Sequence, residues 1–147
     1  MKDRPMKTQP LPVIRPPRWM IDLVNPVVLR VGLFPALTVQ GRRTGTPHTV
    51  PIGGPFEFEG ARYLVSGRGN TAWARNLRAA RLGELRMHGR VQLFRADEVI
   101  GSQRERVVAA YRKALGRSVT GFFARIPDPA NHPVFRIEAL EADSSAA

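Results

Sequence analysis

The 147-residue chain has the length of one ordinary domain, and its 43% hydrophobic content predicts a folded core and excludes a chain that is disordered throughout. Cysteine is absent, which excludes disulfides, thiol catalysis and cysteine metal sites. The formal net charge is +11, and because lysine occurs only at positions 2, 7 and 113, 20 of the 23 basic residues are arginine. This excess indicates either an anionic partner or the codon bias of a GC-rich genome. The histidines are too scattered for a metal motif, so no metal is predicted and any cofactor is expected to be organic.

The N-terminal quarter divides into an arm and an apolar segment. Residues 1–17 contain five prolines and are expected to form an extended arm. Residues 18–32 are expected to form a helix that bends at Pro26. Charges and prolines interrupt this segment, so it is too polar to span a membrane, although residues 18–34 retain the features of a helix lying on a membrane surface. We see no secretory signal, which predicts a cytoplasmic location with membrane association as the alternative.

Beyond this segment, apolar residues alternate with polar ones, which predicts strands separated by turns rich in glycine and proline. Glu59-Gly60 and His88-Gly89 are expected to be hairpin turns. The sequence predicts about seven strands, mostly antiparallel, over residues 36–40, 48–52 and 56–58, over 61–66, on both sides of His88-Gly89, and over 134–140.

Two further helices are expected after the first four strands. Residue 70 or 71 is the candidate N-cap of a short helix whose core-facing residue is Trp73. The sequence "SQRE" at 102–105 reads as a capping box for a helix that ends at Gly116. The segment from 117 to 133, which contains Phe122 and Phe123, is expected to be a loop.

These elements predict an α+β fold, namely a small split antiparallel β-barrel of about six to seven strands with two to three packed helices. Residues 18–140 are expected to form this single domain, and residues 141–147 a disordered tail.

A basic turn, "GRRTG" at 41–45, lies between the first two predicted strands. Successive backbone N–H groups in a glycine-rich turn form a concave anion site, and Arg42 and Arg43 would add charge-assisted hydrogen bonds. Thr44 supplies a hydroxyl donor. A phosphate would fit, while a solvated basic hairpin is the competing interpretation. The turn is not a P-loop, because the Lys-Ser/Thr ending and the strand-to-helix placement are missing.

A second polar loop, "SGRGN" at 66–70, joins a strand to a helix N-terminus. Free N–H groups at a helix N-terminus favour an anionic or electron-rich ligand. Arg68 between two glycines repeats the composition of the first turn. An ordinary glycine-rich connection is again the alternative, but two such loops in one small barrel favour a binding function.

Three segments together, "LTVQGRRTGTPHTVPI", "RYLVSGRGNTAWARNLRA" and "HPVFRIEAL", resemble in order and spacing the deazaflavin-dependent nitroreductase family of split β-barrel flavin and deazaflavin oxidoreductases. The resemblance covers roughly residues 18–140. Its most specific feature is the pair formed by the Gly-Arg-Arg-Thr-Gly turn and the Trp-x-x-Asn-Leu-Arg segment about thirty residues later.

The resemblance implies an enzyme that binds coenzyme F420 and passes a hydride from its C5 to a quinone, a nitroaromatic or an activated alkene. The basic turn would hold the phosphate and acidic tail of the coenzyme, and the loop at 66–70 would border its ring. His48 stands where the family often has an arginine. A histidine could still donate a hydrogen bond to phosphate, but its charge, unlike that of arginine, would depend on pH. The implied cofactor-binding residues are Arg42, Arg43, Thr44, His48, Pro51, Ser66, Gly67, Arg68, Gly69, Asn70 and Trp73.

The resemblance leaves the substrate and the proton donor open. The loop at 66–70 is shorter than in the best-known nitroreductases, and Ala74 replaces a tyrosine common in the family. Tyr63, Tyr111 and Ser66 are the candidate proton donors besides solvent, because hydride chemistry belongs to the cofactor and asks little of acid-base residues.

Two other functions compete with this one. The same fold could bind FMN or haem, as other branches of the barrel superfamily do. The net charge and the apolar segment also suit a non-catalytic binder of acidic lipid or nucleic acid, but no nucleic acid partner is expected, because the few aromatic residues are not interleaved with a basic stripe. The expected partner is a small-molecule substrate, and the resemblance further implies a homodimer.

Overall fold

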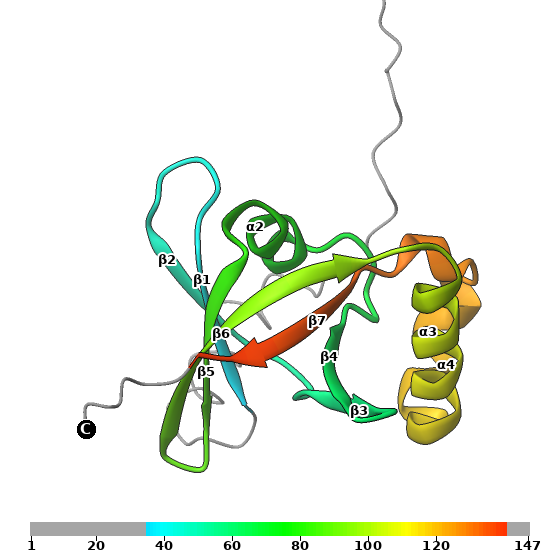
Figure 1. The fold of residues 1–147 in the computed structure, drawn as a ribbon. Helices are drawn as coiled ribbons and strands as arrows, with labels where there is room; N and C mark the ends of the chain where they lie inside the picture. The colour runs from blue at the N-terminus through cyan, green and yellow to red at the C-terminus, as the bar shows by residue number, and fades with distance from the viewer. Residues whose placement is uncertain (1–34, 141–147) are drawn as a thin grey trace, which may run out of the picture.

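The computed structural model describes residues 35–140, which form one seven-stranded sheet with helices packed beside it (Figure 1). The strands are β1 (Ala36–Gln40), β2 (Pro47–Pro51), β3 (Phe56–Phe58), β4 (Ala61–Val65), β5 (Leu82–Met87), β6 (Arg90–Val99) and β7 (Val134–Ala139). The helices are α2 (Ala72–Ala80), α3 (Gly101–Leu115), α4 (Arg117–Arg125) and the short 3-10 helix η2 (Pro129–Asn131). The predicted arm, first helix and tail lie outside the described residues.

The sheet runs in the order β2-β1-β5-β6-β7-β4-β3, and every neighbouring pair is antiparallel. β2 and β3 are its two edges, so the sheet curls without closing. This arrangement confirms the predicted α+β split barrel. Within residues 35–140, no helix is long and apolar enough to cross a membrane.

Both predicted hairpin turns are confirmed by their backbone geometry. Glu59 and Gly60 have φ values of 51° and 79°, and His88 and Gly89 have 51° and 77°. A two-residue hairpin of the type that follows the twist of the strands requires positive φ at both positions, and glycine adopts it without strain.

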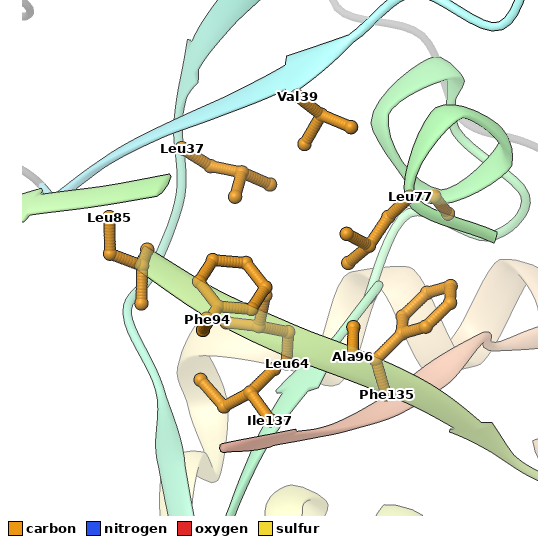
Figure 2. Close-up of a cluster of buried hydrophobic side chains, with 10 residues drawn as sticks. Leu37, Val39, Leu64, Leu77, Leu85, Phe94, Ala96, Phe135 and Ile137 are labelled. Atoms are coloured by element: carbon orange, nitrogen blue, oxygen red, sulfur yellow. The ribbon is translucent and has the colours of Figure 1, made fainter. Parts of the chain in front are cut away.

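The sheet and helices enclose two hydrophobic clusters. In the first, Leu37, Leu64, Phe94 and Phe135 on the inner face of the sheet meet Leu77 of α2 (Figure 2). In the second, buried residues of α3 and α4 pack against β4, the end of β6 and the start of β7, and the residues are Tyr63, Val99, Val107, Val108, Val119, Phe123 and Val134. The two clusters place α2 beside the β1–β2 hairpin and the α3–α4 pair at the other end of the sheet (Figure 1).

Helix α2 starts where the sequence predicted, because the Thr71 side chain accepts a hydrogen bond from the backbone N–H of Ala74. The prediction that Trp73 is the core-facing residue is wrong: Ala74 and Leu77 are fully buried, while Trp73 is half-buried. The helix turns residues 74 and 77 directly toward the sheet, so the indole beside them reaches only the margin of the core, where it lies 6.2 Å from the ring of Phe135.

Two predictions about the C-terminal helices are also wrong. Helix α3 begins at Gly101 after the N-cap Ile100, and no side chain caps it, so 102–105 lies inside the helix and is not a capping box. The segment predicted as a loop forms helix α4 after Gly116 ends α3. Val119 and Phe123, four residues apart, are both buried, and this burial outweighs the low helix propensity of the glycine between them.

Candidate functional site

The basic turn joins β1 to β2 and is closed by its own backbone. The Gly41 N–H donates to the Thr46 carbonyl at 2.8 Å, and the Gly45 N–H donates to the Gly41 carbonyl at 2.9 Å. Gly45 has a φ of 79°, a conformation that side chains beyond glycine rarely adopt. These bonds hold the turn in one shape and leave the arginine side chains outside it.

Asn76 of α2 ties this turn to the helix. Its Oδ1 accepts from the backbone N–H of Arg42 at 3.1 Å and from Arg42 Nη1 at 2.7 Å. Asn76 is only 6% exposed, so both hydrogen bonds are shielded from water. The tie explains why the Gly-Arg-Arg-Thr-Gly turn and the Trp-x-x-Asn-Leu-Arg segment occur together. The predicted site did not include Asn76, although an amide beside Leu77 on the buried face of a helix was a signal for it.

The turn and the first turns of α2 line a pocket of about 350 Å³. Its lining residues are Val39, Gly41, Arg42, Arg43, Thr44, His48, Val50, Ala72, Trp73 and Asn76. No carboxylate is among these described residues. Within residues 35–140, no hydrogen bond or ion pair engages the Arg43 guanidinium, so its five N–H donors are available to a ligand.

Thr44 and His48 add two more polar groups to the pocket. Thr44 Oγ1 accepts from the Thr46 N–H at 3.2 Å, which leaves its hydroxyl hydrogen free to donate. The His48 imidazole lies so close to Gly41 that a Cβ on that glycine would sit 2.9 Å from Nε2. The absence of a side chain at Gly41 is therefore what lets the imidazole approach the turn.

The second predicted loop, residues 66–70, connects β4 to α2 and does not line this pocket. Hydrogen bonds between its own residues hold this loop. Ser66 Oγ donates to the Gly69 carbonyl at 2.5 Å, and the Gly69 N–H donates to the Ser66 carbonyl at 3.2 Å. The buried ring of His132 also contacts the Ser66 carbonyl, at 3.1 Å from Nδ1. The pocket and the loop are adjacent parts of one region, because α2 starts at the end of the loop and its first turn lines the pocket.

Side chains of α3 and α4 cover the middle of this loop. The Arg68 guanidinium lies over the Phe122 ring, 4.9 Å from its centroid. A Cβ on Gly67 would be 3.3 Å from Phe122 and 3.7 Å from the Tyr111 hydroxyl, so both aromatic residues lie close to the loop backbone. Arg68 is thus stacked on an aromatic ring, whereas Arg43 is unengaged.

Two of the predicted binding residues, Asn70 and Pro51, do not line the pocket. Asn70 is 9% exposed, and its Oδ1 accepts from Arg78 Nη1 at 3.3 Å. Arg78 in turn pairs with Glu98 of β6, with Nε 2.7 Å from Oε1. Pro51 ends β2 opposite Ala36, outside the residues that line the pocket.

The three candidate proton donors differ in how their hydroxyls are placed. Ser66 is 2% exposed and its hydroxyl points back to the loop. Tyr63 is buried and its oxygen accepts from Gln103 Nε2 at 3.3 Å. Tyr111 is half-buried beside Gly67, and burial raises the pKa of its hydroxyl above the ordinary value near 10, so the phenol stays neutral.

The sequence profile of the F420H(2)-dependent quinone reductases matches residues 26–119, more than half of the chain. The chain belongs to this family. The protein is therefore an oxidoreductase that uses coenzyme F420 as a hydride donor, which confirms the resemblance inferred from the motifs. Among curated proteins, no sequence matches the chain.

Solved structures are similar in fold to this F420-dependent reductase. An F420-H2 dependent reductase (FDR-A) aligns with a TM-score of 0.54 at 21% identity, covering 71% of this chain and 92% of that chain. A structure described as a domain-swapped dimer aligns with a TM-score of 0.52 at 19% identity, covering 82% of this chain and 98% of that chain. HutZ, the haem storage protein from Vibrio cholerae, aligns with a TM-score of 0.52 at 12% identity, covering 80% of this chain and 90% of that chain. These likenesses establish the split-barrel fold, and it is the family match that selects F420 over haem.

Proposed function

We propose that this F420-dependent reductase binds the anionic end of the coenzyme in the pocket beside the basic turn and the coenzyme ring along the loop at 66–70. The observation that carries the proposal is the pocket itself. It combines the unengaged guanidinium of Arg43, the hydroxyl of Thr44 and the imidazole of His48, with no carboxylate among the described lining residues.

The chemistry of these donors fits a phosphate and an acidic tail. Guanidinium groups form charge-assisted and bidentate hydrogen bonds with phosphate and carboxylate oxygens. Ala72 and Trp73, in the first turn of α2, line the same pocket, so the positive end of the helix dipole adds to its potential. Arg42 has a different part in this proposal: its bonds to Asn76 fix the turn that presents Arg43.

The loop at 66–70 supplies a small, firmly held surface for the ring. Reduced F420, when bound, supplies the hydride from C5. The internal bonds of Ser66 and Gly69 set the loop backbone before the ring arrives, and such preorganisation lowers the cost of orienting reactants. Trp73 lines the pocket and packs against the Phe135 ring of the core, so it joins the site to the hydrophobic cluster.

The electron acceptor of this family is a quinone, and we propose a quinone here, with a nitroaromatic or activated alkene as the alternative. A reduced quinone oxygen takes up a proton, and the Tyr111 hydroxyl is the best placed of the three candidate donors. It lies at Gly67 in the loop assigned to the ring, and its raised pKa keeps it protonated.

Titrating the purified protein with F420, followed by the coenzyme's fluorescence, tests the proposal. We expect saturable binding at micromolar concentrations and oxidation of reduced F420 when a soluble quinone is added. No saturable binding in that range would reject the proposal. A flavin or Soret absorption band in the protein as purified would support FMN or haem instead. Retention on DNA or anionic vesicles without coenzyme binding would support a non-catalytic role.

Replacing His48 by arginine should tighten F420 binding by about tenfold, because a permanently charged guanidinium that binds phosphate through two hydrogen bonds replaces an imidazole. His48→Gln, which keeps a hydrogen-bond donor without the guanidinium charge, should bind no more tightly than the wild type. Fluorescence titrations of the three proteins at pH 8 measure this. Equal affinities for all of them would show that residue 48 does not contact the anionic tail.

Replacing Tyr111 by phenylalanine should lower the turnover number for quinone reduction by about tenfold. This loss is smaller than the roughly 10²- to 10⁴-fold contribution typical of a general acid, because water can deliver the proton instead. Because burial raises the Tyr111 pKa, the phenol ionises only above the ordinary tyrosine range, so wild-type turnover should not fall between about pH 7 and 9.5 through loss of this proton. Coenzyme affinity should stay unchanged in the variant. An unchanged turnover number would assign proton delivery to solvent.

The homodimer implied by the sequence resemblance stays a prediction. Light scattering of the purified protein measures its mass, and a monomer at micromolar concentration would contradict it.

A further inference from the structure

We infer that His132 is a positioning residue, which fixes the loop at 66–70 in the geometry that catalysis needs. This inference rests on the proposed placement of the coenzyme ring along that loop. His132 follows η2 and is fully buried. The residue is 66 positions from Ser66 in the sequence, yet its ring contacts the loop backbone directly. The link therefore joins two distant connections of the fold, the one before α2 and the one after α4.

Both nitrogens of the ring lie at carbonyl oxygens. Nδ1 is 3.1 Å from the Ser66 carbonyl oxygen, and Nε2 is 2.6 Å from that of Ile126. A carbonyl oxygen only accepts, so a ring nitrogen forms a hydrogen bond here when it carries a hydrogen. One nitrogen donates in either neutral tautomer, and both donate in the doubly protonated ring. In each case the imidazole lies between the carbonyls of two separate loops.

Packing prevents the ring from turning away from these carbonyls. The Phe123 ring of α4 stacks on the imidazole, with centroids 4.1 Å apart and an interplanar angle of 28°. The guanidinium of Arg112 lies over the same phenyl ring, 4.6 Å from its centroid. The orientation of His132 is therefore set by α3 and α4, the helices whose Tyr111 and Phe122 also cover Gly67.

Ser66 passes this constraint along the loop. Its N–H donates to the Pro133 carbonyl at 2.9 Å, its hydroxyl donates to the Gly69 carbonyl, and its Oγ lies 3.1 Å from the hydroxyl of the N-cap Thr71. A shift of the Ser66 carbonyl would therefore move both the glycine backbone and the start of α2. The competing interpretation is a core histidine that adds stability without setting the loop geometry.

Two substitutions of His132 and one control separate these interpretations. His132→Phe keeps an aromatic ring for stacking but donates to neither carbonyl. His132→Gln retains amide N–H donors and is the conservative replacement, and it also serves if the phenylalanine variant fails to fold. Val119→Ala, the control, disturbs the same buried cluster, removes no hydrogen bond and keeps the Phe123 ring that stacks on His132.

Hydrogen exchange by mass spectrometry and steady-state kinetics are the readouts. In His132→Phe we expect the amides of 66–70 to exchange at least about tenfold faster and the turnover number with reduced F420 and a quinone to fall about tenfold, with partial recovery in His132→Gln. Val119→Ala should lower the melting temperature while leaving exchange at 66–70 and turnover within about twofold.

The outcomes distinguish this inference from the proposed function. Unchanged exchange at 66–70 in His132→Phe, or equal losses of turnover in His132→Phe and Val119→Ala, would overturn the positioning role. If the wild type bound no F420, the proposed function would fail, while faster exchange confined to 66–70 in His132→Phe would still support the role of His132 in fixing the loop.

Discussion

Replacing Arg43 by alanine is expected to weaken F420 binding by about 10- to 100-fold, the loss that follows from removing a charge-assisted hydrogen bond of about 1.5–3 kcal/mol. The guanidinium lines the pocket and has no hydrogen bond or ion pair within residues 35–140, so its removal should leave the melting temperature within about 2 °C of the wild type. Fluorescence titration at two salt concentrations measures the effect, and the loss should shrink at high salt.

Arg90→Ala is the matched control for the loss of one positive charge. Arg90 is exposed, and its guanidinium has no hydrogen bond or ion pair to any described residue. The β5–β6 hairpin that carries it lies at the opposite end of the strands from the basic turn (Figure 1). Its replacement should change the affinity by less than about twofold, because exposed charges separated by more than about 10 Å are largely screened. An Arg43→Ala protein that binds like Arg90→Ala would exclude Arg43 from the tail site.

The elements that the sequence predicted correctly are those specified by local chemistry. The hairpins at Glu59-Gly60 and His88-Gly89 need positive φ, which few residue pairs supply. Thr71 caps α2 through its own hydroxyl. Helix α4 was missed because its stability comes from burying Val119 and Phe123 against distant parts of the chain, and a window of sequence does not contain those partners.

In the candidate site, too, features specified by local sequence could be predicted, and those that depend on tertiary contacts could not. Glycines and arginines pointed to the basic turn, and the structure brings Arg42, Arg43, Thr44 and His48 together around one pocket. Trp73, which was expected behind the loop at 66–70, lines this pocket as well. Coenzyme binding by these residues stays a prediction. The sequence did not indicate that Arg68 would stack on Phe122, or that two buried side chains, Asn76 and His132, would hold the turn and the loop. Such roles depend on which backbone groups a side chain meets after folding, and a single sequence carries no direct signal for them.

Replacing Asn76 by alanine is expected to lower both stability and coenzyme affinity. The change removes the acceptor of two shielded hydrogen bonds from Arg42 and should cost about 1–3 kcal/mol of the free energy of unfolding, measured by urea denaturation. Coenzyme affinity should fall by about tenfold or more, because the turn that presents Arg43 and Thr44 is no longer preorganised.

Asn76→Asp separates the two effects. A carboxylate of the same size accepts both hydrogen bonds from Arg42, so the stability should remain within about 0.5 kcal/mol of the wild type. The affinity should still fall, because Asn76 lines the pocket and a negative charge there repels the anionic tail of F420. Repulsion is screened by salt, so this loss should decrease as salt is raised, whereas the loss in Asn76→Ala should not recover. If Asn76→Asp bound F420 as tightly as the wild type, the anionic tail would have to lie elsewhere than in this pocket.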